Sequence, residues 1–366
     1  GPVASKDGPA SFLRANESAF EVDTGDSKLN SITSDYSVQE DVLAGYLLGR
    51  WDSDTLRVIG GARVERTWNQ LNGFIVPEED PDAAIAQQFE RDYTDWLPSL
   101  TVRFSPQNDM VFRAAAYKSL MRPKLSKLAP RLVVNEDNEA ESGNPDLKPY
   151  KAWNFDAGWD YYFSGNGAIS VGGFYKTIDN YIIDANYLEY TYQGETYEEF
   201  ATSINGKSAQ ILGLEASYSQ VMNFLPAPFD GLLVQANYTY TYSKGMVLDE
   251  DGVERRISLP SNSRNTFNIV LGYEKGPISL RAAGTYRDKY LDEVGGNAEE
   301  DRYVDNHFQL DLSAKYRLTK NIRLFAEWVN VNNAKYFAYQ NFSGRQRVLQ
   351  YEEYGPTVKF GAKVNF

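Results

Sequence analysis

The side chains that most often carry out catalysis are nearly absent from this sequence. Its 366 residues include no cysteine and one histidine, His307, so a thiol nucleophile, a His-based triad and a Cys- or His-rich metal site are ruled out. His307 opens a stretch of alternating polar and apolar residues, so we expect it on the polar face of a strand. The glycine pairs at 60–61 and 295–296 lack the strand-to-helix context of a phosphate loop. The sequence therefore predicts a protein that is not an enzyme.

Acidic clusters are the first candidate binding groups. They lie at residues 136–141, 195–199, 249–254 and 299–301, in a chain with 50 acidic and 37 basic residues and a net charge of −13. Solubility of exposed loops explains them, and so does binding of a divalent cation or attraction of a cationic ligand. We predict no cofactor and leave a divalent cation in the acidic loops open. The negative charge argues against a nucleic-acid partner.

Aromatic residues in two polar segments are the second group of candidates. Aromatic faces can stack on sugar rings while Asn, Asp and Arg bond the hydroxyl groups. The alternative is an aromatic girdle or packing between loops. Arg122 is a further candidate, with contacts to neighbouring loops as its alternative role. The candidate ligand-binding residues are Tyr187, Tyr190, Tyr192, Tyr197, Arg122, Tyr336, Tyr339 and Asn341.

The elements that must position these residues show a period of two. From Phe308 to Leu318 every second residue is apolar, and the residues between them are Gln, Asp, Ser, Lys and Arg. After a polar turn at 319–321, the alternation resumes from Ile322 to Trp328. Such alternation predicts β-strands, and two of them joined by a tight turn predict a β-hairpin.

This hairpin unit recurs along the chain, with tight turns and long polar connections in strict alternation. The connections at 69–93, 119–149 and 182–207 are among the long ones. Membrane barrels show this asymmetry, with short periplasmic turns and long extracellular loops. The polar strand faces carry too much charge for a dry core, so we expect the apolar faces to contact lipid. The thirteen expected strands lie near 39–51, 55–68, 95–104, 110–118, 153–163, 168–181, 212–219, 232–243, 267–273, 278–287, 308–318, 322–328 and 358–366.

Composition agrees with an all-β transmembrane barrel. Aromatic residues make up 14% of the chain, as interfacial girdles require. The mean hydropathy is −0.50, and no apolar run is long enough for a transmembrane helix. We assign 1–38 to an extracellular loop or tail and 39–366 to the barrel strands. Two alternatives remain: a passive porin-like or adhesive barrel, and a soluble β-sandwich binding module that needs no detergent.

Several stretches resemble TonB-dependent outer-membrane transporters. The most specific are Met121-Arg122-Pro123 and the Gly-Asn-Pro-Asp-Leu-Lys-Pro run at 143–149, which leads into Trp153-Asn154. The hairpin at 36–67 and the segments at 174–182 and 330–333 are similar to further family stretches. The end of the chain resembles the signal read by the barrel assembly machinery, with Phe360, Val364 and Phe366 as its residues.

The resemblance implies a 22-stranded antiparallel up-and-down barrel around an N-terminal plug. This chain would supply about the last thirteen strands, which explains the odd count, and would lack the signal peptide, TonB box, plug and earlier strands. The implied partners are the N-terminal part of the same transporter, TonB acting through the plug, outer-membrane lipids and the barrel assembly machinery. The implied location is the bacterial outer membrane.

The resemblance also implies energy-coupled uptake. The amino-acid sequence of residues 147–154 and 225–232 most resembles a branch of the family common in Caulobacter- and Xanthomonas-like bacteria. Many members of that branch are linked to carbohydrate uptake, so the expected ligand is a carbohydrate. Uptake of a siderophore or another metal chelate by the same mechanism is the alternative.

Overall fold

The computed structural model describes residues 8–20, 28, 31–32, 35–75, 84–135, 137–163, 166–249 and 252–365. Phe366, the last residue of the expected assembly signal, lies outside these residues. So do Glu136 and Glu250-Asp251 of the acidic clusters and part of the segment 1–38. No helix among the described residues is long and apolar enough to cross a membrane.

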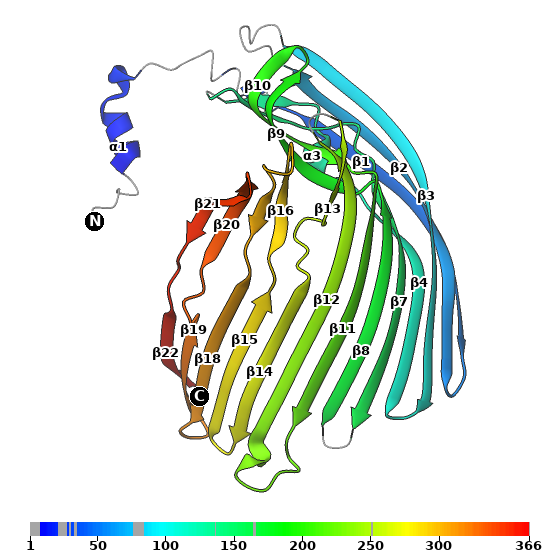
Figure 1. Cartoon of the computed structure of the whole chain (residues 1–366), viewed down its shortest axis with the longest axis vertical. Helices are drawn as coiled ribbons and strands as arrows, with labels where there is room; N and C mark the ends of the chain where they lie inside the picture. The colour runs from blue at the N-terminus through cyan, green and yellow to red at the C-terminus, as the bar shows by residue number, and fades with distance from the viewer. Residues whose placement is uncertain are drawn as a thin grey trace.

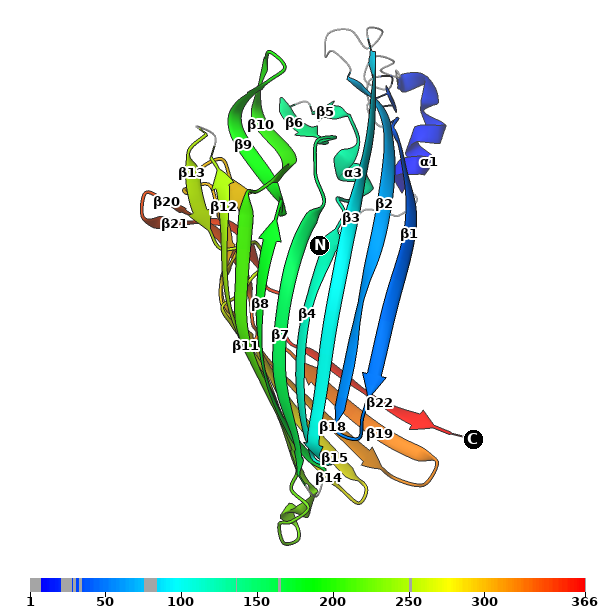
Figure 2. The ribbon, with the colours of Figure 1, turned by 90° about the vertical axis from the view of Figure 1, so that its right-hand side faces the viewer.

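A long, curved antiparallel sheet forms most of the molecule (Figure 1, Figure 2). Thirteen of its strands follow one another in chain order, and the short β13 (Glu254–Ile257) pairs with β12 beside this path. The up-and-down arrangement of thirteen strands predicted from the alternation is confirmed. The strands are β1 (Ser37–Asp52), β2 (Leu56–Ile75), β3 (Ile85–Gln107), β4 (Met110–Met121), β7 (Tyr150–Phe163), β8 (Gly167–Asp179), β11 (Ser208–Val221), β12 (Leu232–Leu248), β14 (Asn265–Lys275), β15 (Ile278–Arg287), β18 (His307–Arg317), β19 (Ile322–Val329) and β22 (Thr357–Val364).

In the membrane part of the sheet, the register places apolar residues of neighbouring strands side by side on one face. Leu312 lies opposite Trp328, which lies opposite Val358 on the next strand. A slip of one residue would exchange the two faces, so the alternation itself specifies the register. The apolar face has no protein layer over it: Leu47 is 81% and Phe360 84% exposed. This face is built to contact lipid, and the opposite, polar face lines the lumen.

The prediction of a polar connection over residues 69–93 is wrong. β2 continues to Ile75 and β3 begins at Ile85, and their ladder runs without a break, for example from Asn72 to Gln88. These outer strand ends contain polar residues at both parities. Both faces of a ladder that has left the membrane are wet, so the hydrophobic alternation that marks a strand is lost there although the backbone pairing continues.

The long connections fold into a second sheet at the end away from the tight turns, as Figure 1 shows for β9, β10, β16, β20 and β21. The expected loops at 119–149 and 182–207 therefore contain strands. Short helices α1 (Gly8–Ala15), η1 (Glu17–Ala19), α3 (Leu125–Leu128) and η3 (Phe229–Gly231) complete the described elements. The order in this sheet is β21 (Arg345–Glu352), β20 (Tyr336–Phe342), β17 (Arg302–Val304), β16 (Tyr290–Gly295), β9 (Ile182–Tyr192), β10 (Glu195–Asn205), β6 (Glu139–Ser142) and β5 (Leu132–Val134).

The two edges of the long sheet are β1 and β22, each paired on one side only among the described residues. An unpaired backbone group in lipid costs several kcal/mol. Both edge strands are long enough to expose a row of such groups. In a membrane each of these edges therefore needs a pairing partner.

The lipid-facing assignment is tested by placing a charge at the centre of β11. Leu214→Arg should destabilise the folded barrel by about 2–4 kcal/mol, because arginine would enter the hydrocarbon layer. Ser217→Arg, three residues further on the polar face of the same strand, should have little effect. The measurement is urea unfolding in lipid vesicles, and equal effects of the two variants would contradict the assignment.

Candidate functional site

A small hydrophobic core anchors the outer loops to the polar face of the sheet. It joins Ile178 and Ala209 of the wall to Ile183 of β9 and Val294 of β16. Tyr181 lies at its centre, 4% exposed, and its hydroxyl donates to the Met246 carbonyl oxygen at 2.7 Å. Burial raises the pKa of Tyr181 to about 12. The outer hairpins are therefore packed elements fixed to the wall.

The Gly-Asn-Pro-Asp-Leu-Lys-Pro segment at 143–149 also contacts the β9–β10 hairpin. A Cβ atom on Gly143 would lie 2.0 Å from the Ala129 carbonyl oxygen, so only glycine fits. The Asn144 amide donates to the Ser203 carbonyl at 2.9 Å. Leu147 is buried with Leu71 and Leu128. The segment that resembles the transporters therefore acts as a clamp between the wall and β10.

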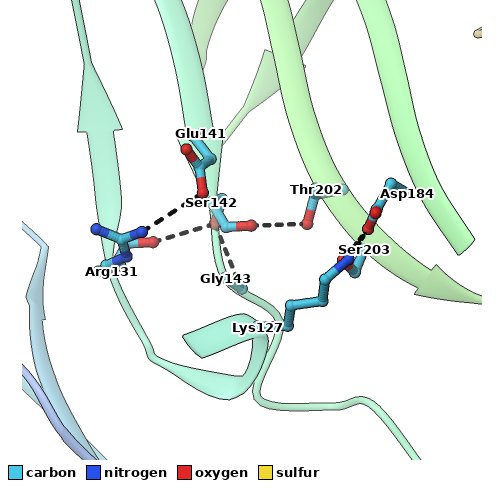
Figure 3. Close-up of polar contacts among 8 residues, drawn as sticks. All are labelled: Lys127, Arg131, Glu141, Ser142, Gly143, Asp184, Thr202 and Ser203. Atoms are coloured by element: carbon cyan, nitrogen blue, oxygen red, sulfur yellow. Dashed lines mark hydrogen bonds and ion pairs between the residues drawn. The ribbon is translucent and has the colours of Figure 1, made fainter. Parts of the chain in front are cut away.

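Above this clamp lies a polar cleft of about 350 Å³. The residues around it come from α3, β5–β6, β9–β10 and β16, which are distant in sequence, and Figure 3 shows the polar contacts among eight of them. The Ser142 hydroxyl lies 3.0 Å from the Gly143 carbonyl oxygen, and the Thr202 hydroxyl donates to the Ser142 carbonyl at 2.9 Å. The lining residues are Ser126, Lys127, Arg131, Glu141, Ser142, Gly143, Asp184, Ala185, Asn186, Ala201, Thr202, Ser203, Glu293 and Val294.

The charges in the cleft form two ion pairs. Lys127 pairs with Asp184, which also accepts a hydrogen bond from the Ser203 hydroxyl at 2.6 Å. Arg131 lies 3.4 Å from Glu141. Burial opposes the charge of Asp184, but the hydrogen bonds from Lys127 and Ser203 outweigh it and lower the pKa of that carboxyl. The cleft thus offers charged donors and acceptors beside hydroxyl groups, which suits a polar ligand with several hydrogen-bonding groups.

The four tyrosines predicted in residues 182–207 lie together on β9 and β10. They pack around Phe200, with ring centroids 4.9 Å away for Tyr190 and 4.8 Å for Tyr192. Tyr187 stacks on Tyr190 at 4.9 Å, and Tyr197 is 6% exposed. This geometry matches the alternative of packing between loops. Their role in ligand binding stays a prediction.

The other predicted site residues lie elsewhere. Tyr339 is 1% exposed and stacks on Tyr303, while Tyr336 and Asn341 flank it on β20, with Asn341 exposed. Arg122 lies on the wall and donates to Glu65 Oε2 at 2.5 Å and to Thr67 at 3.0 Å. The structure therefore does not bring Arg122 or the β20 residues to the aromatic cluster of β9 and β10.

The acidic segment 299–301 contains a buried ion pair. Asp301 accepts two hydrogen bonds from Arg255, at 2.7 and 2.8 Å, and one from the Gly295 backbone at 3.0 Å. The carboxylate thereby ties β13 to the loop after β16. Across the described ranges, no three His, Cys, Asp or Glu side chains are grouped to hold a metal ion.

Sequence reasoning missed most of the cleft. Lys127, Arg131 and Glu141 lie in a segment expected to be a plain connection, and Ser203 in a tyrosine-rich one. Each is an ordinary polar residue in its local context. They meet because β6 pairs in parallel with β10, a contact between segments about 60 residues apart that no local pattern indicates.

The sheet with its exposed apolar face, its polar inner face and its packed outer hairpins has the features of an outer-membrane β-barrel. Comparison with protein families agrees. Residues 7–333 match the family described as TonB dependent receptor-like, beta-barrel. The chain belongs to this family. Its members are integral outer-membrane proteins and transporters, which confirms the predicted location and the prediction that the protein is not an enzyme.

Solved structures show the same architecture. The chain is similar to Fiu, a ferric-catecholate import receptor of E. coli K12, with a TM-score of 0.64 and 16% identity over 90% of this chain and 45% of Fiu. It is also similar to the siderophore receptor PiuA of Acinetobacter baumannii, with a TM-score of 0.62 and 15% identity over 90% and 44% of the two chains.

A third similar structure is the iron transporter FrpB of Neisseria meningitidis, with a TM-score of 0.62 and 14% identity over 93% of this chain and 48% of FrpB. The chain therefore spans about half the length of the structures it matches. At these identities the similarity establishes the fold. A search of curated proteins found no match.

The clamp is tested at its glycine. Gly143→Ala should lower the free energy of local opening by about 1–3 kcal/mol, because the added methyl group meets the Ala129 carbonyl. Gly45→Ala in β1, where the added Cβ has open space, is the control. Hydrogen exchange of the β5–β6 and β9–β10 amides measures the effect, and equal protection in both variants would contradict the clamp.

The pKa of Asp184 predicts a pH dependence. Because its folded pKa lies below the ordinary value of 3.8, its ion pair with Lys127 is present above about pH 4 and is lost as the pH falls through the folded pKa. Asp184→Asn should therefore speed proteolysis of the β9–β10 hairpin at pH 7 and leave its rate unchanged below that pKa. Pepsin at low pH and trypsin at pH 7 give the two rates, and a difference between variant and wild type that persists at low pH would disprove this role.

Proposed function

We propose that the chain forms the C-terminal part of the barrel of a TonB-dependent transporter that takes up a ligand across the outer membrane. The family match over residues 7–333 carries this proposal. The thirteen-stranded wall and the packed outer hairpins support it, since a transporter of this kind needs both a lumen and a binding surface at its mouth. TonB and an N-terminal plug are the partners that the family implies.

Residues 1–38 in this proposal belong to an extracellular segment that leads into the first of these strands, and residues 37 and 38 already pair in β1. β1 begins at Ser37, at the end of the sheet that carries the outer hairpins. The chain enters the wall there and runs toward the tight turns. The remaining 39–366 supply the strands and the loops of this part of the barrel.

For the ligand, we propose a metal chelate of the siderophore type. Fiu, PiuA and FrpB are described as ferric-catecholate, siderophore and iron transporters. Arg131 and Lys127 in the cleft can bind the anionic oxygens of such a chelate, with the hydroxyls of Ser142 and Thr202 as further hydrogen-bond partners. Carbohydrate uptake, the ligand expected from resemblance, has no support among these neighbours and is the second candidate in the test.

The test is uptake by cells that carry the whole receptor and TonB. A panel of ⁵⁵Fe-labelled catecholate, hydroxamate and citrate chelates and of labelled oligosaccharides should show uptake of one iron chelate. A protonophore should abolish that uptake. Uptake that persists without the proton gradient would favour a passive pore, and uptake of a sugar alone would overturn the proposed ligand.

The cleft is tested in the same cells. Arg131→Gln should raise the half-saturating concentration of the transported chelate about tenfold, which corresponds to the loss of one charged hydrogen bond of about 1.5 kcal/mol. Lys207→Gln, which breaks an exposed ion pair with Glu254 outside the cleft, is the matched control. Equal half-saturation in the two variants would place the ligand elsewhere.

A further inference from the structure

The outer face of the long sheet changes from apolar to polar along one row of residues. Each member of the row lies opposite the next on the neighbouring strand: Lys118, Trp153, Thr177, Gln210 and Lys244. One position closer to the tight turns, the same face carries only apolar or aromatic residues: Ala116, Phe155, Tyr175, Leu212 and Tyr242. The row therefore marks the level at which the hydrocarbon layer gives way to the headgroups of the outer leaflet.

Two cations come together at the β12 end of this row. Arg256 of β13 lies opposite Met246 of β12, at the end of the sheet that carries the outer hairpins (Figure 1). Its guanidinium donates a hydrogen bond to the hydroxyl of Tyr242. Lys244 lies between Met246 and Tyr242 on the same face of β12, so the Arg256 side chain runs past it. Both cations therefore lie at the headgroup level, next to one tyrosine hydroxyl.

The described carboxylates nearest to these two cations have other partners or lie further away. Glu254, on the outer face of β13, forms an ion pair with Lys207. Asp249 accepts a hydrogen bond at 2.7 Å from the backbone at the far end of the β12–β13 hairpin. Asp179 belongs to β8, two strands away from β12. The loop at 258–264 contains no acidic residue. Among the described residues, neither of the two cations belongs to an ion pair.

The polar groups at this point suit an anion with several oxygens. The Tyr242 hydroxyl accepts its hydrogen bond from Arg256, so its own hydrogen can be donated to another acceptor. The exposed Gln210, opposite Lys244, can add its amide N–H groups. A phosphate group accepts charge-assisted hydrogen bonds from such donors. We propose that Lys244, Arg256 and Tyr242 form a site on the outside of the barrel for the phosphate group of an outer-leaflet lipid.

The surface below the cations favours a lipid over a free anion. Leu212 lies opposite Tyr242, and Leu214 lies opposite Tyr240 one position closer to the tight turns. Both leucines are exposed on the apolar face. The acyl chains of a lipid whose phosphate is held by the cations would cover these side chains, whereas a free anion would leave them bare. Because the site lies on the outer face, the proposal does not depend on which ligand passes through the lumen.

The site also reaches the contacts that hold the outer loops. Successive residues of β13 point to opposite sides of the wall. Arg256 points outward, while Arg255 donates two hydrogen bonds to the buried Asp301 at 2.7 and 2.8 Å. Ile257 belongs to the hydrophobic core that joins the outer hairpins to the wall. A lipid bound at Arg256 would therefore hold in place the strand whose other face fastens these loops.

The first test uses the whole receptor in phosphatidylcholine nanodiscs that contain a small fraction of lipid A, a glycolipid with two phosphate groups. Native mass spectrometry measures the lipid A retained per receptor. Lipid A without its phosphates should bind at least tenfold more weakly. Lys244→Gln/Arg256→Gln should weaken binding of the phosphorylated lipid about tenfold, because two charged donors are lost. The control is Arg66→Gln/Lys118→Gln, which removes two outer-face cations from β2 and β4 and should change binding less than twofold.

A second pair of variants leaves every charge in place. Tyr242→Phe removes the hydroxyl beside Arg256 and should weaken binding about threefold, as expected for one neutral donor. Tyr240→Phe, at the next position on the same face of β12, should leave binding unchanged. The heat-dependent gel mobility of each variant shows whether it is folded. Equal effects within either pair of variants, equal binding of the two lipids, or displacement of the lipid by millimolar inorganic phosphate at constant ionic strength would overturn the proposal.

Hydrogen exchange of the unmodified receptor tests the link to the outer loops. The amides of β13 should exchange at least threefold more slowly in nanodiscs with phosphorylated lipid A than in nanodiscs with the dephosphorylated lipid. The amides of β21, at the far edge of the outer sheet, should exchange at the same rate in both. Equal exchange of β13 with the two lipids would show that the lipid does not hold this strand.

Discussion

The backbone hydrogen bonds of the strands are the constraint on which the rest of this structure depends. In hydrocarbon, each N–H and C=O group must find a partner within the protein, so only a continuous ladder can stand there. The thirteen strands satisfy one another in chain order, each beside its neighbour in sequence. The short turns, the strict alternation of side chains and the register all follow from that arrangement. The edges of β1 and β22 are the places where the constraint is still open.

Outside the membrane the same chain obeys different rules. Water satisfies the backbone there, and the hairpins are free to fold over the lumen. They are held by a small core around Tyr181, by the clamp at Gly143 and by the buried pair of Arg255 and Asp301. These three sets of contacts hold the hairpins whose residues form the polar cleft. Gly143 of the clamp and Val294 of the core also line the cleft, so the contacts that hold the hairpins in place help to shape it.

Acidic and basic residues are concentrated at opposite ends of the long strands. Acidic clusters lie in the outer loops, and cations face one another near the tight turns, at Arg57 and Arg103 on one side and at Arg317 and Arg323 on the other. The overall charge of −13 conceals this separation. A wet lumen makes such rows tolerable in the wall.

Alternation by itself determined the strands, their number and the lipid-facing side, because a period of two is a local property that hydrocarbon imposes on each strand separately. It failed beyond Trp68, where β2 and β3 continue in water and no longer need an apolar face. The resemblance of residues 143–149 to the family was visible in the sequence, but the role of Gly143 as a clamp was not, because the atom it must avoid belongs to Ala129 in the folded loop. Only the tertiary structure decided which residues meet in the cleft, that Tyr197 and Tyr339 are buried, and that Arg122 pairs with the wall. Those outcomes depend on contacts between segments far apart in the chain, and the chemistry of each residue alone does not specify its partner.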